Sequence, residues 1–172
     1  KAEVEYTGCP VVFRTHVVIE GDPKVSILIP NKDHTEDLNK CVTSILERST
    51  WKNIQIIVIE NNSEKEETFH YYEELEKRYP QAKVVTWDGP FNYSAINNFG
   101  AKYADGDYLL LLNNDTEVIT PEWLENMMGY CQREDVGIVG AKLLYPDNTV
   151  QHAGVVVGIA GFAGHILTGY DR

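Results

Sequence analysis

The sequence predicts an α/β fold built on a mainly parallel sheet flanked by helices. From Lys24 onward, short apolar runs alternate with segments of helical periodicity, and this alternation is typical of parallel sheets. After Asp135, two apolar runs flank the turn residues 145–148, which predicts a C-terminal antiparallel hairpin. The chain has 172 residues, 43% of them hydrophobic, enough for one domain with a substantial core.

Four apolar runs are the predicted strands of the sheet. They cover residues 25–29, 54–59, 84–87 and 108–112. The last run is so apolar that we expect it to be buried on both faces of the sheet. Residues 1–23 contain one further candidate strand, at 11–19, and are expected to be an N-terminal linker or extension. The main domain would then cover residues 24–172.

Helical patterns separate these runs. Residues 35–48 carry a continuous apolar stripe with helical spacing. Ser63 and Glu66 have the spacing of a capping box, which predicts a second helix from Ser63 to about Tyr79. Ser94 is a candidate cap for a short third helix.

The C-terminal third has a different texture. Thr120-Pro121 places a proline at the first position of a fourth predicted helix. The predicted hairpin pairs residues 136–144 with residues 149–159. Residues 154–169 are rich in glycine, so we expect a mobile loop there.

The charge of the chain restricts its partners. Asp and Glu number 26 against 15 Lys and Arg, which gives a formal net charge of −11. This charge repels nucleic acid and anionic lipid, and no basic patch overrides it. If the ligand is an anion such as a nucleotide, a divalent cation held by carboxylates would neutralise it.

Cysteine usage and hydropathy indicate a cytoplasmic protein. The three cysteines, at positions 9, 41 and 131, show no CxxC spacing, which favours reduced thiols over disulfides or a zinc site. No segment approaches the roughly 20 apolar residues that span a bilayer, and residues 1–5 lack the apolar core of a signal peptide. We expect any peripheral association with the inner membrane to come only through segments outside this sequence.

Polar residues follow all four predicted strands. Because the carboxyl ends of parallel strands meet at one edge of a sheet, we expect these residues to converge on one cleft. The four polar segments are Pro30-Asn31-Lys32-Asp33, Glu60-Asn61-Asn62-Ser63, residues 88–93, and Asn113-Asn114-Asp115.

These residues suit a bound nucleotide. Asp33, Glu60 and Asn61 offer hydrogen bonds to a base or ribose, and Asp115 offers a hard oxygen ligand to Mg²⁺ or Mn²⁺. The alternative is that Asn and Asp after Leu112 merely form a turn, for which both are common residues. The chain has no GxxxxGK[ST] or GxGxxG loop, which argues against a P-loop enzyme and a dinucleotide dehydrogenase.

Several ordered blocks of the chain resemble the inverting family 2 glycosyltransferases of the GT-A fold. They are the blocks at 25–30, 57–63, 97–101 and 106–115, within a resemblance that covers residues 24–170. It is nearest to the bacterial rhamnosyltransferase-like branch that assembles polysaccharides. The resemblance implies a Rossmann-like nucleotide-diphospho-sugar transferase fold.

The resemblance also implies roles for residues after the first two strands. Pro30, Asn31 and Asp33 would contact the nucleoside, and Glu60 with Asn61 would contact the base. Asn98 and Gly100 match an Asn-x-Gly helix that lies beneath the nucleotide in this family.

Asn113-Asn114-Asp115 matches the DxD metal motif of the family. By resemblance, Asp115 and Asn113 would hold Mn²⁺ or Mg²⁺, and Asn113 and Asn114 would contact the nucleotide. The family usually has aspartate where this chain has Asn113, and an amide oxygen coordinates hard cations more weakly. We therefore expect the metal to bind loosely until the nucleotide supplies further oxygens.

The expected reaction is inverting transfer from a UDP- or dTDP-sugar to a polysaccharide or glycoconjugate acceptor. In the family, the catalytic base is an Asp or Glu on a later segment, and this sequence ends at Arg172 before such a segment. The catalytic residue is therefore unknown. We expect this chain to bind a donor sugar but to transfer it poorly or not at all.

Two other functions remain open. A nucleotidyltransferase uses a related sheet and metal, but normally carries a glycine-rich basic segment where this chain has Pro30-Asn31-Lys32-Asp33. A nucleotide-sugar-binding module that has lost catalysis is the other. His152 is a possible donor contact, although a histidine beside a hairpin is more commonly a packing or surface residue.

Overall fold

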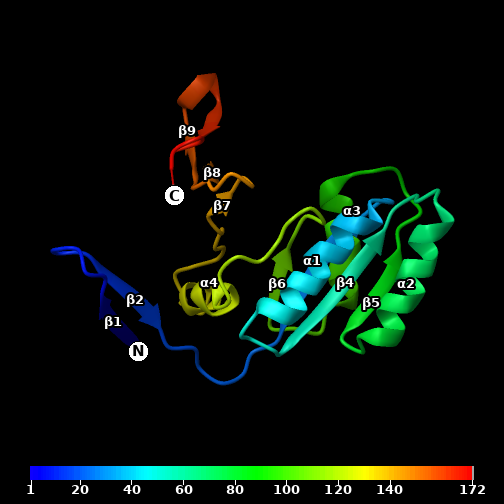
Figure 1. Ribbon diagram of the computed structural model, residues 1–172, viewed down its shortest axis with the longest axis horizontal. Coiled ribbons are helices and arrows are strands. Elements are labelled where there is room, and N and C mark those ends of the chain that lie inside the picture. The colour runs from blue at the N-terminus through cyan, green and yellow to red at the C-terminus, as the bar shows by residue number, and fades with distance from the viewer. Residues whose placement is uncertain (172) are drawn as a thin grey trace. The chain divides into compact units, whose positions relative to one another are not determined.

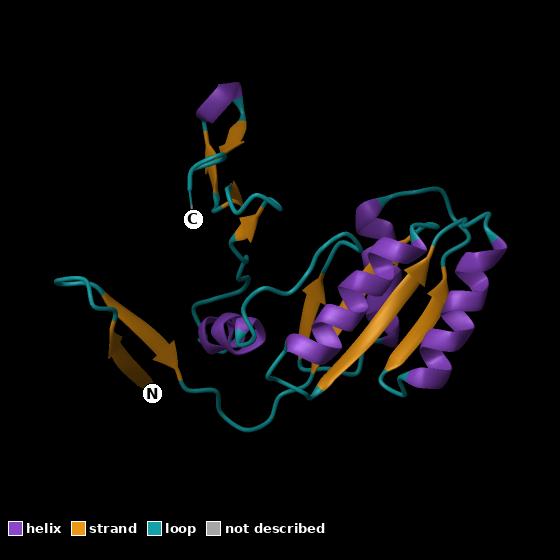
Figure 2. Ribbon diagram, viewed as in Figure 1, coloured by secondary structure: helices purple, strands orange, loops and turns teal. Residues whose placement is uncertain are grey.

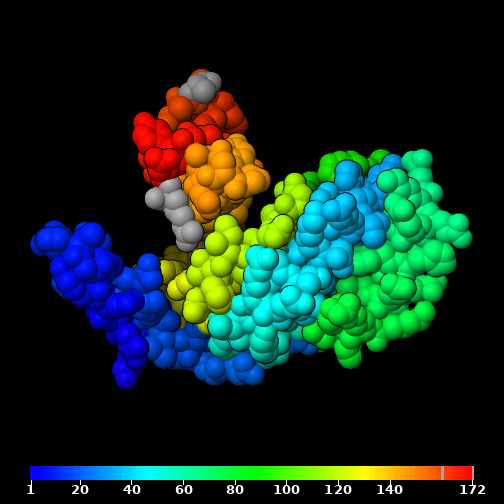
Figure 3. All heavy atoms as spheres, in the orientation of Figure 1, coloured from blue at the N-terminus to red at the C-terminus, as the bar shows by residue number. Residues whose placement is uncertain are grey.

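The computed structural model describes residues 1–171, apart from the side chain of residue 160 (Figure 1, Figure 2 and Figure 3). Arg172, the last residue of the predicted main domain, lies outside the described residues. The chain divides into two compact units. Glu20–Leu124 forms the first, here called the sheet unit, and Lys1–Ile19 with the segment from Glu125 onward forms the second, here called the hairpin unit.

The sheet unit contains a parallel sheet of four strands. The strands are β3 (Val25–Asn31), β4 (Ile54–Glu60), β5 (Ala82–Thr86) and β6 (Tyr108–Leu111), in the spatial order β5-β4-β3-β6. All neighbouring pairs are parallel, which confirms the predicted sheet. The chain moves outward from β3 to β5 and then crosses to the other side of β3, so the strand order reverses between β3 and β6. Ligands of open α/β sheets bind at such a switch point.

Helices cover both faces of this sheet (Figures 1 and 2). The helices α1 (Thr35–Arg48) and α2 (Glu66–Arg78) lie on one face, and α3 (Tyr93–Gly100) lies on the other. A short 3₁₀ helix, Ala101–Tyr103, follows α3 directly. None of the helices in the described part of the chain combines the length and apolar character needed to cross a membrane.

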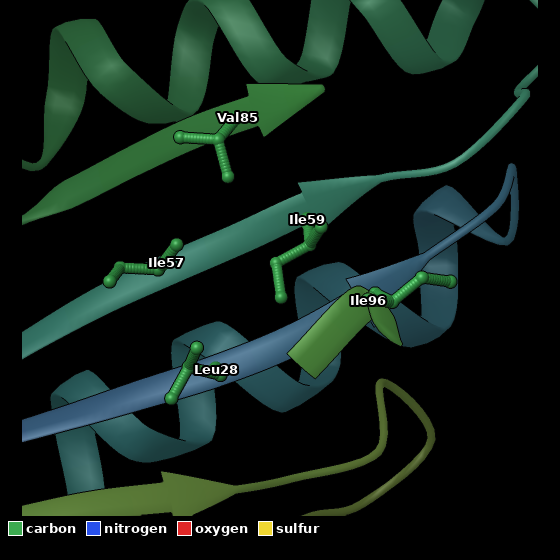
Figure 4. Close-up of a cluster of buried hydrophobic side chains, with 5 residues drawn as sticks. All are labelled: Leu28, Ile57, Ile59, Val85 and Ile96. Atoms are coloured by element: carbon green, nitrogen blue, oxygen red, sulfur yellow. The ribbon is translucent and has the colours of Figure 1, made fainter. Parts of the chain in front are cut away.

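The core follows the two-residue period of the strands. Leu28, Ile57, Ile59 and Val85 form one buried cluster with Ile96 of α3 (Figure 4). The alternate residues Ile27, Ile29, Ile56 and Val58 are all fully buried as well, and they point to the opposite face because successive side chains alternate. Burying an isoleucine contributes about 1.5–3 kcal/mol, so this two-sided core stabilises the sheet that positions the strand ends.

The expected burial of the last strand on both faces is wrong. Leu109 and Leu111 of β6 are 54% and 49% exposed. Among residues 1–171, β3 is the one strand that pairs with β6, so β6 is at the edge of the sheet. Apolar composition alone does not show whether a strand is central or at the edge.

The structure corrects two predicted helix caps. α1 spans the predicted residues 35–48, but α2 begins at Glu66 and the Ser63 capping box does not form. The Ser63 hydroxyl instead donates to the Glu60 carboxylate. Asn92, rather than Ser94, caps α3, and its Oδ1 accepts the Ala95 N–H at 3.0 Å.

The N-terminal part of the hairpin unit is more regular than a linker. The strands β1 (Ala2–Tyr6) and β2 (Phe13–Val17) form an antiparallel pair, where the sequence predicted a single strand at 11–19. α4 (Trp123–Cys131) continues from the sheet unit into the hairpin unit. The Gln132 side chain donates to the Val18 main-chain oxygen at 2.8 Å.

The predicted C-terminal hairpin is present but shorter. β7 (Leu143–Leu144) pairs with β8 (Val150–His152) around the predicted turn. β9 (Val155–Val157) leaves this hairpin and pairs with β10 (Ala163–His165). The expected mobile loop at 154–169 therefore contains a strand pair. Gly154, Gly158 and Gly161 have positive φ between or beside these strands, and the β-branched residues Val155–Val157 form β9.

Candidate functional site

Hydrogen bonds join the polar ends of all four strands of the sheet. The Asn61 N–H donates to the Asn31 main-chain oxygen at 2.9 Å. The Asn114 Nδ2 donates to Asn31 Oδ1 at 2.6 Å, which links the residues after β6 to the end of β3. The Asn61 Nδ2 donates to the main-chain oxygens of Trp87 and Gly89, at 3.1 and 2.9 Å, just beyond β5. The predicted convergence of these segments is confirmed.

Pro30 lies where β6 separates from β3. Even-numbered residues of β3 bond towards β6, as the 3.0 Å bond from Leu112 N–H to Leu28 O shows. Pro30 follows in this series and has no N–H to continue the ladder. The β3–β6 register ends at Leu28, whereas the β3–β4 register continues to Asn31. Proline thus opens the sheet at its switch point.

Glu60 is buried at the end of β4 and is only 3% exposed. Its carboxylate accepts hydrogen bonds from the Ser63 N–H, from the Ser63 hydroxyl and from the Tyr72 hydroxyl, the last at 2.6 Å. A buried carboxylate needs such donors because it loses its hydration. The expected contact of Glu60 with a base remains a prediction.

Asn31 is the central residue of the site and is 3% exposed. Its Nδ2 donates to the Tyr72 hydroxyl at 2.8 Å and to the Asp33 main-chain oxygen at 2.7 Å. Burial, and next the hydrogen bond to Glu60, raise the pKa of Tyr72, so its hydroxyl stays protonated at neutral pH. The sequence placed Asn31 at the nucleotide but gave no role to Tyr72.

Asp33 connects the loop after β3 to the start of α2. Its backbone has φ 53°, in the left-handed region that Asp tolerates better than most residues. Its Oδ1 accepts the N–H groups of Glu64 and Lys65, at 3.1 and 3.0 Å, and the Thr68 hydroxyl at 3.3 Å. Asp33 therefore holds the two residues that precede α2 and the Thr68 hydroxyl in the first turn of α2, and its predicted contact with the nucleoside stays a prediction.

We expect Asp33→Asn to lower the midpoint of thermal unfolding at pH 7. We also expect the midpoint of this variant to decrease less than that of the parent chain as the pH is lowered. The Lys65 N–H is the main cause that holds the pKa of Asp33 below its ordinary value, partly opposed by desolvation. A depressed folded-state pKa gives stability that is present above the unfolded-state pKa and lost as pH falls through the folded pKa. Thermal melts between pH 7 and pH 3 test this, with the exposed Glu134→Gln as the control for losing one charge. The prediction would be contradicted if the melting midpoints of Asp33→Asn and of the parent chain fell equally between pH 7 and pH 3.

The predicted metal motif forms a turn that contacts α1. Asn113 and Asp115 are exposed, and Asn114 is half-buried. The Cys41 thiol of α1 lies 3.7 Å from the Asn113 main-chain oxygen and 3.6 Å from the Thr116 hydroxyl. Burial raises the pKa of this thiol, so it acts as a neutral packing group rather than a metal ligand.

The donor set at this turn fits a hard cation that shares its coordination with a ligand. Within residues 1–171, no three His, Cys, Asp or Glu side chains gather as a ready-made metal site. The Asp115 carboxylate and the Asn113 amide are both exposed oxygen donors. Mg²⁺ is commonly held by one or two carboxylates together with substrate phosphates and waters, rather than by a protein cage.

Other predicted residues occupy less central positions. Asn98 is exposed on α3, and Gly100, two residues later, is buried against the sheet. Lys32 pairs with Glu64 at 3.1 Å on the surface. His152 lies in the hairpin unit, where its Nδ1 is 2.8 Å from Nδ1 of His165. The role of His152 as a donor contact stays a prediction.

Two functional candidates were missed from the sequence. Ser63 was predicted as a helix cap and Tyr72 received no role, yet both bond to Glu60. Buried polar groups need partners, so Glu60 at the end of a buried strand was the signal that a hydroxyl from a covering helix would meet it.

The comparison with protein families places the chain. The model of the family described as "Glycosyl transferase family 2" matches residues 26–155. The chain belongs to glycosyl transferase family 2. The matched range contains the parallel sheet, apart from the first residue of β3, and its polar strand ends.

Two curated bacterial relatives match 91% of this chain. One is the O-antigen biosynthesis protein RfbC of Myxococcus xanthus, 47% identical over 156 residues. The other is the uncharacterized protein y4gI of Sinorhizobium fredii, 44% identical over 156 residues. The chain spans only 12% and 17% of the length of these two relatives.

A solved structure shares the fold. The mannosyltransferase PcManGT from Pyrobaculum calidifontis, in complex with GDP-Man and Mn²⁺, aligns with 68% of this chain and 34% of its own chain. The TM-score is 0.61 and the sequence identity is 14%, so this likeness concerns the fold alone. It confirms the GT-A architecture predicted from the sequence blocks.

Proposed function

We propose that this chain is the donor-binding part of a glycosyltransferase. It binds a nucleoside-diphosphate sugar at the carboxyl edge of the sheet, with Mn²⁺ or Mg²⁺ on the diphosphate. The sugar is then transferred with inversion to a saccharide acceptor of a polysaccharide or glycoconjugate. The relative named for O-antigen biosynthesis supports an acceptor of this class.

One observation carries the proposal. The side chains after β3, β4 and β6 form one hydrogen-bonded group at the switch point of the sheet, and Asp115 is exposed beside it. Open α/β sheets bind ligands at this point. The family match makes a nucleotide sugar the class of ligand that this arrangement suits.

Each part of the edge has a proposed role. Pro30, Asn31 and Asp33 line the nucleoside side with Glu60 and Asn61. Asn98 lies near the nucleotide, and Asn113 and Asn114 contact the nucleotide. Asp115 and Asn113 would hold the metal, which neutralises the charge on the diphosphate leaving group when it is bound.

Titration of the chain with UDP, dTDP and GDP tests the proposal. Isothermal calorimetry in Mn²⁺ and in EDTA should show binding of at least one diphosphate, at least 10-fold tighter with the metal. A preference for the triphosphate would favour a nucleotidyltransferase, which the family match already disfavours. No binding of any nucleotide by the folded chain would overturn the proposal.

A module without catalysis is the second candidate. Asn113 supports it, because an amide replaces one of the two acidic ligands usual in the family, so a metal would be held less firmly. Restoring the carboxylate with Asn113→Asp separates the two candidates in a longer chain that contains the acceptor segment. Transfer by the parent sequence establishes the enzyme, whereas transfer only by Asn113→Asp establishes the inactive module.

A further inference from the structure

Four side chains form one continuous series of hydrogen bonds across the candidate site. Asn114 Nδ2 donates to Asn31 Oδ1 at 2.6 Å, and Asn31 Nδ2 donates to the Tyr72 hydroxyl at 2.8 Å. The Tyr72 hydroxyl then donates to Glu60 Oε2 at 2.6 Å. The series joins the metal motif after β6 to the acidic residue at the end of β4, by way of β3 and α2.

Two acceptors fix the direction of the bonds in this series: the Glu60 carboxylate, and the Asp33 main-chain oxygen, to which Asn31 Nδ2 also donates at 2.7 Å. A carboxylate only accepts, so the single proton of the Tyr72 hydroxyl goes to it and the hydroxyl oxygen must accept from Asn31. Asn31 therefore turns its Nδ2 towards Tyr72 and its Oδ1 towards Asn114. Asn114 in turn must present Nδ2 to Asn31, which leaves its carbonyl oxygen facing away from Asn31.

We propose that Tyr72 is a positioning residue that, together with the Asp33 main-chain oxygen, sets the orientation of the Asn31 and Asn114 carboxamides and so couples the nucleoside end of the site to the metal end. This inference rests on the proposed function. Tyr72 itself, 5% exposed on the inner side of α2, does not touch the ligand. It acts through Asn31.

The consequence for binding is pre-organisation. A carboxamide has two faces of opposite hydrogen-bonding character, and a free one samples both. Tyr72 and the Asp33 main-chain oxygen select the orientation in which the Asn114 oxygen, an acceptor, is the end left for a ribose hydroxyl or for a metal-bound water. A ligand that meets this orientation already formed loses less entropy on binding.

The neighbouring residue provides a matched control. Tyr71 is also on α2 and is partly buried, but its hydroxyl has no hydrogen-bond partner among the described residues. Removing this hydroxyl deletes the same atom from the same helix without touching the series. Tyr71→Phe should therefore leave nucleotide affinity unchanged.

The test compares UDP affinity in Mn²⁺ for the parent chain, Tyr72→Phe and Tyr71→Phe. We use whichever diphosphate the parent chain binds best if that is not UDP. Tyr72→Phe should bind UDP about 5- to 10-fold more weakly, because the hydrogen bond from Asn31 Nδ2 to the Tyr72 hydroxyl, which helps to orient the Asn31 carboxamide, is lost. Thermal melts of the same samples separate this loss from unfolding. If Tyr72→Phe lowers only the melting midpoint and leaves affinity unchanged, the inference is overturned.

A second variant tests the series from its other end and does not depend on the core. Asn114→Asp is isosteric and adds a carboxylate beside the metal motif, but it has no N–H to donate to Asn31 Oδ1. Charge alone predicts tighter binding in Mn²⁺, whereas the series predicts at least 5-fold weaker binding. Unchanged or tighter binding by Asn114→Asp would contradict the inference.

Failure of this inference and failure of the proposed function give different results. If the parent chain binds no nucleoside diphosphate, both are wrong. If the parent chain binds one and the two variants bind it equally well, the proposed function stands and only the role of Tyr72 falls.

Discussion

Asp115→Asn is expected to weaken the binding of UDP in Mn²⁺ by about 100-fold. Asp115 is the exposed carboxylate of the metal motif, and its partner Asn113 is already a neutral amide. Removing it leaves the motif with no anionic ligand, and a metal–carboxylate interaction is worth several kcal/mol, of which 1.4 kcal/mol corresponds to tenfold in affinity. Calorimetry with and without EDTA measures the loss. In EDTA, where no metal bridges the two partners, the variant and the parent chain should bind UDP alike.

Glu117→Gln is the matched control for this prediction. It removes the same charge two residues further along the same loop, but Glu117 lies 3.6 Å from Arg48 of α1 and is half exposed. Its affinity for UDP in Mn²⁺ should stay within about twofold of the parent chain. If Asp115→Asn and Glu117→Gln weakened binding equally, the loss would come from the net charge of the loop, and Asp115 would not be a metal ligand.

The sequence was sufficient for the sheet and for the place of the candidate site. The apolar stripe at 35–48 predicted α1 to the residue, because helical periodicity and a helix boundary are both local signals. The convergence of the residues after β3, β4, β5 and β6 followed from topology alone. Parallel strands put their carboxyl ends at one edge whatever the side chains are.

The interactions that complete the site were not local. Asp33 accepts the N–H of Lys65, just before α2, although the two residues are far apart in sequence, and Ser63, with the local spacing of a capping box, bonds instead to Glu60. Leu109 of β6 is exposed, and the apolar composition of a strand does not show which of its faces will be covered. Tyr72 looked like an apolar helix residue, since a sequence pattern places the ring but not the hydroxyl.

The close approach of α3 to the sheet depends on Gly100. A Cβ built on this residue would lie 2.3 Å from Ile59 Cδ1 and 2.6 Å from Leu28 Cδ2. Both side chains are fully buried in the cluster of Figure 4, so neither end is free to move aside. The backbone of Gly100 is helical, and the need for glycine is therefore one of space, not of conformation. Gly100 closes the Asn-x-Gly pattern that the sequence places beneath the nucleotide.

Gly100→Val is expected to lower the thermal unfolding midpoint by about 6–12 °C, because overpacking a closed core costs about 1–3 kcal/mol and each kcal/mol shifts the midpoint of a chain of this size by about 2–4 °C. Valine brings three carbon atoms into space that does not hold one, so we expect the upper end of that range. Gly137→Val is the control, since no heavy atom lies within 4 Å of the Cβ built there. Melts of both variants by circular dichroism decide the matter. If Gly100→Val and Gly137→Val melt at the same temperature, α3 can shift on the sheet without loss of stability. Gly100 would then not fix the position of α3.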